Sequence, residues 1–206
     1  MEVRKLQEWE NPDEKNKVGE RKRFMEIRGG KDYTIADIEA LPEGERAELI
    51  DGEMFRMDAP TWTHQSILVK LVLRIGTYIE QNRGKCRVIP APFAVYIKKD
   101  SRNYVEPDIS VICDDEKKSE KGCQGAPDWV IEILSPSSMK MDCERKVKLY
   151  RESGVREYWI VDAERETVTV YDFEHRKEAV HYTFSERIKA GIFESLCLDF
   201  SEMDFS

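Results

Sequence analysis

Two carboxylate side chains interrupt apolar segments that otherwise have the composition of buried strands. Glu132 lies inside the run from Trp129 to Leu134, and Asp108 follows Pro107 inside the run from Tyr104 to Cys113. Burying an unpaired charge is costly, so a buried carboxylate is normally paired with a cation, protonated or bound to a metal. Two such residues in strand-like segments suggest a metal site.

The alternation of side chains along a strand predicts how these two carboxylates are oriented. Successive side chains of a strand point to opposite faces, so Glu132 lies opposite Ile131, and Asp108 lies opposite Ile109. If the two strands are neighbours, both carboxylates project to the same side, within reach of one metal ion. Ligands that are all oxygen favour a hard cation, Mg²⁺ or Mn²⁺, over zinc.

The predicted helix that follows Glu132 adds a lysine to the two carboxylates. Cys143, Val147 and Tyr150 recur at helical spacing and define an inward stripe, and Lys146 falls inside this stripe. A buried lysine beside two carboxylates is held by their charge, and it can orient an attacking water or stabilise a developing oxyanion. The hydroxyl of Tyr150 can reach the same site from the helix.

The same residues also fit an arrangement that contains no metal. Glu132, Asp108 and Lys146 would then form a buried ion-pair network, in which Asp142, one turn before Lys146, holds the ammonium group. From spacing alone, the metal site and the ion-pair network carry equal weight. A third arrangement places Glu132 at an exposed sheet edge, which its apolar neighbours on both sides disfavour.

The rest of the chain must supply the elements that position these side chains. Hydrophobic periodicity predicts a mixed β-sheet flanked by α-helices, which is an α/β fold, and it predicts an exposed loop over Asp114 to Gly125. Helices are expected over Thr34 to Leu41, Thr63 to Gln81 and Met141 to Glu152, and a hairpin around Asp51-Gly52. Strands are expected over Val88 to Ile97, Tyr104 to Cys113, Asp128 to Leu134, Arg156 to Asp162, Thr167 to Phe173, Val180 to Phe184 and Leu196 to Leu198.

Length and composition indicate one globular domain. The chain has 206 residues, of which 40% are hydrophobic and 36% charged. Residues 1–30 form a charged N-terminal extension without a sustained apolar period, so the domain is expected over residues 31–206. No window is apolar enough for a membrane span or a signal peptide, so a cytoplasmic protein without a membrane partner is expected.

The five cysteines are odd in number and widely separated, and none of them forms a Cys-x-x-Cys pair. This spacing indicates neither a zinc knuckle nor a disulfide framework. Reduced thiols in a reducing compartment are therefore expected.

The net charge of −8 provides no global attraction for nucleic acid. A local basic face can still bind phosphates, and two loops carry candidates for one. These are Lys98-Lys99 with Arg102, and Arg83-Gly84-Lys85 with Arg87. Ordinary solvated loop charges are the favoured interpretation of both groups.

Several motifs in a fixed order resemble the PD-(D/E)xK nuclease superfamily and, within it, the Uma-two family of putative restriction endonucleases. The resemblance runs from about Tyr33 to Tyr171, and it is specific because the motifs occur together. The motifs are Glu48-Leu-Ile-Asp-Gly-Glu53, His64, Glu106-Pro-Asp108, Glu132-Ile-Leu-Ser-Pro-Ser137, Asp142-x-x-x-Lys146-x-x-x-Tyr150 and Gly154-Val-x-Glu157-Tyr-Trp-Ile-Val-Asp162.

The resemblance implies a restriction-endonuclease-like fold with Asp108 and Glu132 as metal ligands and catalytic residues. The superfamily's usual lysine, two residues after the glutamate, is absent, because Leu134 occupies that position. In the family that this chain resembles, the lysine comes from the following helix, which corresponds to Lys146. Glu48 is implied as an additional acidic residue near the metal, although a surface carboxylate beside a hairpin is an equal alternative.

The implied reaction is Mg²⁺- or Mn²⁺-dependent hydrolysis of a DNA phosphodiester, without an organic cofactor. Double-strand cleavage would need two sites, so the analogy suggests a homodimer. His64, Asp142 and Tyr150 are accessory candidates, although a lone histidine on an apolar helix face is more often a hydrogen-bonded packing or capping residue. The rival function is a catalytically silent, nuclease-like module that binds nucleic acid or protein, and the acidic net charge slightly favours it.

Overall fold

The computed structural model describes residues 32–135, 138–203 and 205. The N-terminal extension predicted over residues 1–30 lies outside the described residues. Within the described part of the chain, no helix combines the length and apolar composition needed to cross a membrane.

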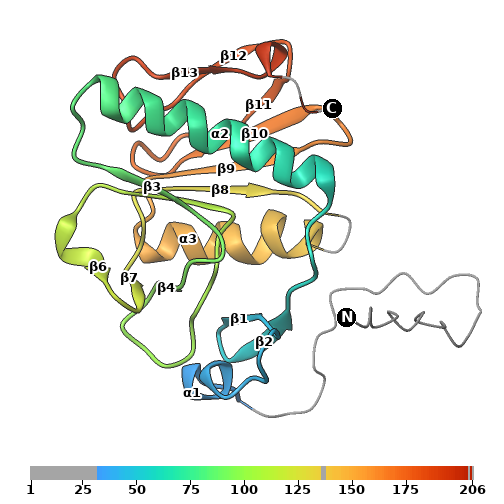
Figure 1. Ribbon diagram of the computed structural model, residues 1–206, viewed down its shortest axis with the longest axis vertical. Helices are drawn as coiled ribbons and strands as arrows, with labels where there is room; N and C mark the ends of the chain where they lie inside the picture. Colours follow the sequence, from blue (N-terminus) through green and yellow to red (C-terminus); the bar gives the residue numbers. More distant parts are fainter. Residues whose placement is uncertain (1–31, 136–137, 204, 206) are drawn as a thin grey trace, which may run out of the picture.

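A mixed six-stranded sheet forms the centre of the fold (Figure 1). The expected α/β architecture is therefore confirmed. Its strands run in the order β11 (Val180–Thr183), β10 (Thr167–Asp172), β9 (Glu157–Asp162), β8 (Trp129–Ile133), β5 (Ile109–Ile112) and β3 (Arg87–Pro90). The pair β8 and β9 is parallel, whereas every other neighbouring pair in this sheet is antiparallel.

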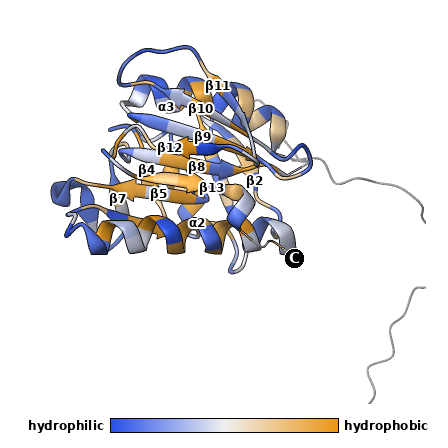
Figure 2. Ribbon diagram, turned by 90° about the horizontal axis from the view of Figure 1, so that it is seen from above, coloured by the Kyte–Doolittle hydropathy of each residue, from blue (hydrophilic) through white to orange (hydrophobic). Residues whose placement is uncertain are grey.

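Helices cover both faces of the sheet, as the two ribbon views show (Figures 1 and 2). The helix α2 (Trp62–Gln81) buries one apolar stripe, which includes Ile67, Leu71 and Ile75, in the same core cluster as Trp129. The opposite face carries a π-helical turn, η2 (Met141–Lys146), that continues into α3 (Val147–Ser153). The alternation predicted for β8 is confirmed, because Trp129, Ile131 and Ile133 belong to one apolar cluster and Val130 to the cluster on the other side.

A hairpin that precedes α2 brings Glu48 into contact with Lys146 on the α3 side of the sheet. Its strands are β1 (Ala47–Ile50) and β2 (Glu53–Arg56), and a short helix, α1 (Ile35–Glu39), precedes them. Both turn residues, Asp51 and Gly52, have positive φ, as the tight two-residue turn requires. The predicted hairpin and capping-box helix are therefore confirmed.

The long strand predicted over Val88 to Ile97 is wrong. The strand β3 ends at Pro90, the N–H of Ala91 still donates to the carbonyl of Asp108, and Pro92, which has no N–H, does not continue the ladder. The chain then joins a separate three-stranded sheet in the order β4 (Val95–Tyr96), β7 (Gly122–Gln124) and β6 (Lys118–Ser119).

Two neighbouring predictions are wrong in part. The run from Tyr104 to Cys113 is a strand only in β5, because Tyr104 and Val105 form isolated bridges to Leu49 and Val95. The segment Asp114 to Gly125 is not a loop throughout. It contains a 3-10 turn, η1 (Asp115–Lys117), together with β6 and β7.

The C-terminal end of the chain packs on the α2 side of the sheet. An antiparallel pair, β12 (Arg187–Lys189) and β13 (Cys197–Asp199), is followed by a 3-10 turn, η3 (Phe200–Glu202). Ile188, Leu198 and Phe200 are buried in the same cluster as α2. The strand near residue 196 was expected from the sequence, whereas β12 was not.

The expectation that all cysteines are reduced is wrong, because Cys86 and Cys113 form a disulfide. These residues flank β3 and β5, whose register pairs Arg87 with Ile112. The residue before one strand therefore faces the residue after the other. Their separation of 27 positions in the sequence concealed this contact.

Replacing Cys86 and Cys113 with serine should lower the free energy of unfolding by about 3–4 kcal/mol. The reason is that the bridge closes a loop between residues 27 positions apart in the unfolded chain. Denaturant titration of the wild type with and without reductant measures the same difference. Equal stability in both conditions, together with five titratable thiols after unfolding without reductant, would contradict the bridge.

Candidate active site

An open groove of about 1700 Å³ lies where the β1–β2 hairpin, the start of α2 and the η2 turn meet the sheet. Six of the seven residues singled out from the sequence line it, and the seventh, Tyr150, bonds to one of them. The six are Glu48, His64, Asp108, Glu132, Asp142 and Lys146. The structure therefore brings together a set that spans about half of the chain.

Glu132 lies on β8, whereas Asp108 lies directly before the adjacent strand β5 and not in it as predicted, and each carboxylate accepts a backbone N–H from the other segment. The backbone N–H of Ile133 donates to Asp108 Oδ2 at 2.7 Å, and the N–H of Asp108 donates to Glu132 Oε2 at 3.3 Å. Glu132 is only 3% exposed, in a strand with neighbours on both sides. The alternative that places Glu132 at an exposed sheet edge is therefore wrong.

Lys146 lies among three carboxylates. Its Nζ is 2.8 Å from Glu48 Oε2, 2.9 Å from Glu132 Oε1 and 3.3 Å from Asp142 Oδ1. The inward position predicted for Lys146 is confirmed.

One member of the predicted inward stripe is misplaced, because Cys143 is exposed. The segment that contains it is π-helical and winds more residues into each turn than an α-helix. The wider turn buries Met141, Asp142 and Lys146 in place of Cys143.

Tyr150 donates its hydroxyl to the same glutamate oxygen that Lys146 contacts. The hydroxyl is 2.7 Å from Glu132 Oε1. Burial, together with the negative charges of Glu132 and Glu48, raises the pKa of Tyr150, so the phenol stays protonated. Oε1 of Glu132 therefore accepts hydrogen bonds from both Lys146 and Tyr150.

Glu48 contacts the site from the hairpin and is only 1% exposed. One oxygen faces Lys146, and the other, Oε1, accepts the backbone N–H of Glu106 at 3.0 Å. The alternative of a surface carboxylate beside the hairpin is wrong.

His64 lies in the first turn of α2, where its N–H donates to the capping hydroxyl of Thr61. Its Nε2 is 3.1 Å from Asp108 Oδ2. Burial lowers the pKa of His64, but the hydrogen bond and the charge of Asp108 outweigh it, and the net shift is upward. His64 is thus a hydrogen-bonded helix residue that contacts a predicted site carboxylate.

The site holds more negative than positive charge. Burial raises the pKa of Glu132 and, less strongly, raises that of Asp142 to about 6, while Lys146 opposes both shifts. Burial alone would lower the pKa of Lys146, but Glu132, Glu48 and Asp142 raise it above its ordinary value. The ammonium therefore stays charged, and one cation faces several carboxylates that compete for it.

The carboxylate oxygens of the groove are suitable ligands for a hard cation that takes few of its ligands from the protein. Among the described residues, no group of three His, Cys, Asp or Glu side chains is placed to hold a metal ion by itself. Asp108 and Glu132 nevertheless offer two carboxylates in an open groove that carries surplus negative charge. Mg²⁺ typically binds one or two carboxylates and completes its shell with water and substrate phosphate, so these residues fit it.

Two further residues of the groove had no role assigned from the sequence. Glu106 was part of a motif, and Arg46 carried no signal, yet Arg46 bonds to the carboxylate of Glu106 across 60 positions of sequence. Tyr158 packs in the core, and its hydroxyl also donates to the carbonyl of Asp142 at 3.1 Å.

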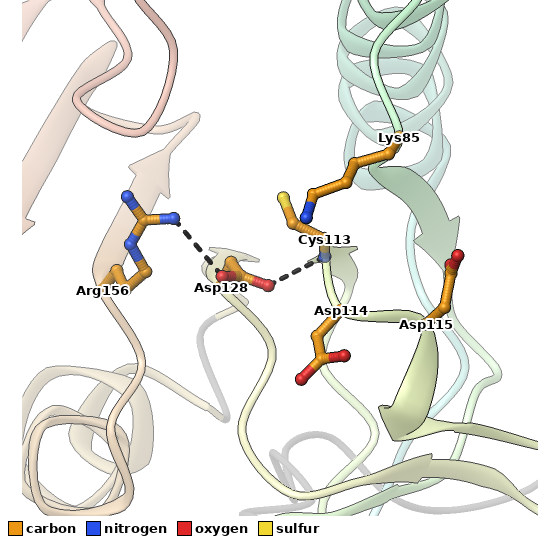
Figure 3. A pocket seen from close by; sticks show the side chains of 6 residues that line it. All are labelled: Lys85, Cys113, Asp114, Asp115, Asp128 and Arg156. Atoms are coloured by element: carbon orange, nitrogen blue, oxygen red, sulfur yellow. Dashed lines mark hydrogen bonds and ion pairs between the residues drawn. The ribbon is translucent and has the colours of Figure 1, made fainter.

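A second pocket, of about 500 Å³, lies at the opposite ends of β5 and β8 (Figure 3). It includes Lys85, which belongs to one of the basic groups noted in the sequence. Asp128 accepts the N–H of Cys113 at 2.8 Å and lies 3.4 Å from Arg156 (Figure 3). This pocket contains none of the predicted site residues.

Substituting Lys146 should destabilise the metal-free protein at neutral pH more than substituting Glu132. Lys146→Met leaves buried carboxylates without their cation and should cost about 3–5 kcal/mol. Glu132→Gln should cost less, because burial raises the pKa of Glu132 and disfavours its ionised form, and Lys146 keeps Glu48 and Asp142 as partners. Denaturant titration in a chelator measures both free energies of unfolding, and an equal or larger loss in Glu132→Gln would contradict this surplus of buried negative charge.

Comparisons with known proteins place this chain in a family. The model of the Uma2 family, described as a putative restriction endonuclease, matches residues 35–201. An uncharacterized protein of Synechocystis is 25% identical over 151 residues, which cover 70% of this chain and 76% of that protein.

A solved structure shares the fold. It is a putative nuclease belonging to DUF820 from Anabaena variabilis, and it matches with a TM-score of 0.68 at 24% identity, covering 82% of this chain and 96% of that one. Because the family model spans most of the sequence, the chain belongs to the Uma2, or Uma-two, family of putative restriction endonucleases.

Proposed function

We propose that this protein is a metal-dependent endonuclease that hydrolyses phosphodiester bonds in DNA. The observation that carries the proposal is the contact of Lys146 with Glu132, which itself bonds to Asp108, in one open groove. These are the residue types that metal-assisted phosphodiester hydrolysis requires: two carboxylates and a cation that remains charged.

In this proposal Asp108 and Glu132 hold Mg²⁺ or Mn²⁺, which would polarise the scissile phosphate and lower the pKa of a bound water. The backbone N–H of Ile133 orients Asp108, and Tyr150 together with Lys146 orients Glu132. Fixed orientation matters because a site that is displaced by about 1 Å can lose roughly 10²-fold in rate.

Lys146 has the second role. Its ammonium group positions the attacking water and offsets negative charge that develops on the phosphate. Glu48 and Asp142 hold the ammonium group in place from two other elements, the hairpin and the η2 turn. His64 restrains Asp108 through Nε2. No covalent intermediate is needed in this scheme.

Cutting both strands of a duplex requires two such sites, so the proposal includes a homodimer that places one groove on each strand. The number of copies that act together can be read from the dependence of the double-strand cleavage rate on protein concentration.

Asp108→Asn and Lys146→Met should each reduce Mg²⁺-dependent cleavage of plasmid DNA by at least about 10²-fold, because each removes a group that acts on the reacting phosphate. The matched control is Lys148→Met, which removes an exposed lysine from the same helix. Lys148→Met should cleave like the wild type.

The outcome of this assay separates a nuclease from a silent binding module. A wild type that binds DNA but cuts no more than the Asp108→Asn and Lys146→Met variants, on plasmid and on single-stranded substrates, would support the silent module instead. Equal losses in Lys148→Met and Lys146→Met would show that the assay reports overall charge rather than this site.

Metal binding separates the proposed site from a purely structural ion-pair network. Wild-type protein should bind Mn²⁺ with a defined stoichiometry in calorimetry, and Asp108→Asn should lose this binding because it removes one of two carboxylate ligands. The control is Asp115→Asn, which alters an exposed carboxylate of the second pocket. If the wild type binds no Mn²⁺, or if only Asp115→Asn loses the binding, the ion-pair network is favoured.

A further inference from the structure

Arg46 presents a restrained guanidinium group on the wall of the groove. Its side chain is 36% exposed and lines the same groove as Glu48 and Lys146. Nε and Nη2 both donate to one oxygen of Glu106, Oε2, at 2.8 Å and 2.5 Å. The side chain is therefore accessible to solvent while its charged end is fixed in orientation.

The carboxylate that holds Arg46 is itself fixed. Glu106 is buried, and its other oxygen, Oε1, accepts the hydroxyl of Tyr104 at 2.8 Å. Burial and the neighbouring carboxylate raise the pKa of Tyr104, so this hydroxyl remains a donor. Glu106 thus acts as a rigid support whose two oxygens are both occupied.

The bonds to Glu106 leave part of the guanidinium available. Arginine has five N–H donors in a planar fork, and Glu106 accepts one from Nε and one from Nη2. Among the described residues, no other acceptor is bonded to this group. The remaining edge can receive the two oxygens of a phosphate, the geometry in which arginine binds phosphates most strongly.

Short contacts link Arg46 to the proposed catalytic residues. The backbone N–H of Glu106, the residue that holds Arg46, donates to Glu48 Oε1 at 3.0 Å. The other oxygen of Glu48 lies 2.8 Å from Lys146 Nζ. Arg46 is therefore linked to Lys146 through Glu106 and Glu48, and all four residues line the same groove.

The other cations of the groove are less suited to this role. Lys146 is buried and shared by three carboxylates. Arg145 forms an ion pair with Glu53 and stacks over the ring of Phe55 at 5.1 Å. Lys140 is exposed at the surface and carries no fork for bidentate contact.

We propose that Arg46 binds a backbone phosphate of the nucleic-acid strand next to the bond that the site would cut. This inference rests on the proposed function, because it concerns the same groove. It would supply one phosphate contact in an acidic groove of a protein whose net charge is −8. A fixed guanidinium positions the strand at little entropic cost and leaves Lys146 for the reacting phosphate.

The test is binding of a fluorescent DNA oligonucleotide in EDTA, so that no cleavage occurs, at several salt concentrations. Arg46→Ala should weaken binding by about 10- to 100-fold, the effect of losing a charged hydrogen bond. The slope of log K against log salt should fall by about 1, because one phosphate contact is lost. Arg46→Lys should fall between the wild type and Arg46→Ala.

Two further variants separate a phosphate contact from loss of structure. Arg56→Ala removes an arginine of the same hairpin that is 51% exposed, is paired with Glu45 and lies outside the groove lining, so binding should not change. Glu106→Gln removes the support but keeps the charge of Arg46, so affinity should fall while the salt slope stays at the wild-type value. Unfolding curves establish that each variant is folded.

The inference and the proposed function can fail separately. If wild type cleaves DNA but Arg46→Ala keeps the wild-type salt slope and KM, the role of Arg46 is overturned and the nuclease stands. If oligonucleotide binding depends on Arg46 but no cleavage occurs, the inference stands and the nuclease falls. Equal effects of Arg46→Ala and Arg56→Ala, or no binding by wild type, would overturn the inference.

Discussion

The ammonium group of Lys146 is the charge on which the arrangement of the groove depends. It lies within 3.3 Å of carboxylates from the hairpin, from β8 and from its own helical turn. Without it, three buried negative charges would face one another in a medium that screens them poorly. With Lys146 in place, the three carboxylates are held close together, and their negative charge still exceeds its positive charge. A second, divalent cation beside Asp108 would complete the balance.

This charge cluster explains features of the fold that would otherwise be unrelated. The π-helical turn places Asp142 and Lys146 on the same buried side, where α-helical spacing alone would have put Cys143. Glu48, in the first strand of the hairpin, contacts Lys146 with one oxygen and the backbone N–H of Glu106 with the other.

The central part of the site was predictable because it depends on local periodicity. Strand alternation put Asp108 and Glu132 on one face, and helical spacing put Lys146 toward them. The resemblance to a known family supplied Glu48, whose contact with Lys146 spans most of the domain and leaves no trace in local spacing.

Features that depend on contacts distant in sequence were not predictable in the same way. The bridge between Cys86 and Cys113 follows from the register of β3 and β5, which no periodicity reveals. Arg46 and Glu106 are 60 positions apart in the sequence and meet only through the tertiary fold. The division of Val88 to Ile97 into two strands was signalled by Pro92, whose lack of an N–H ends the ladder after Ala91.

In the proposed site a divalent cation binds between Asp108 and Glu132, next to a lysine that other carboxylates already hold. Anomalous diffraction from crystals grown with Mn²⁺ locates this cation. We expect a manganese peak within coordinating distance, about 2.0–2.3 Å, of oxygens from both carboxylates, while Lys146 keeps its contact with Glu132. Well-diffracting crystals with no peak there, or a peak only in the pocket beside Asp128, would contradict this proposed site.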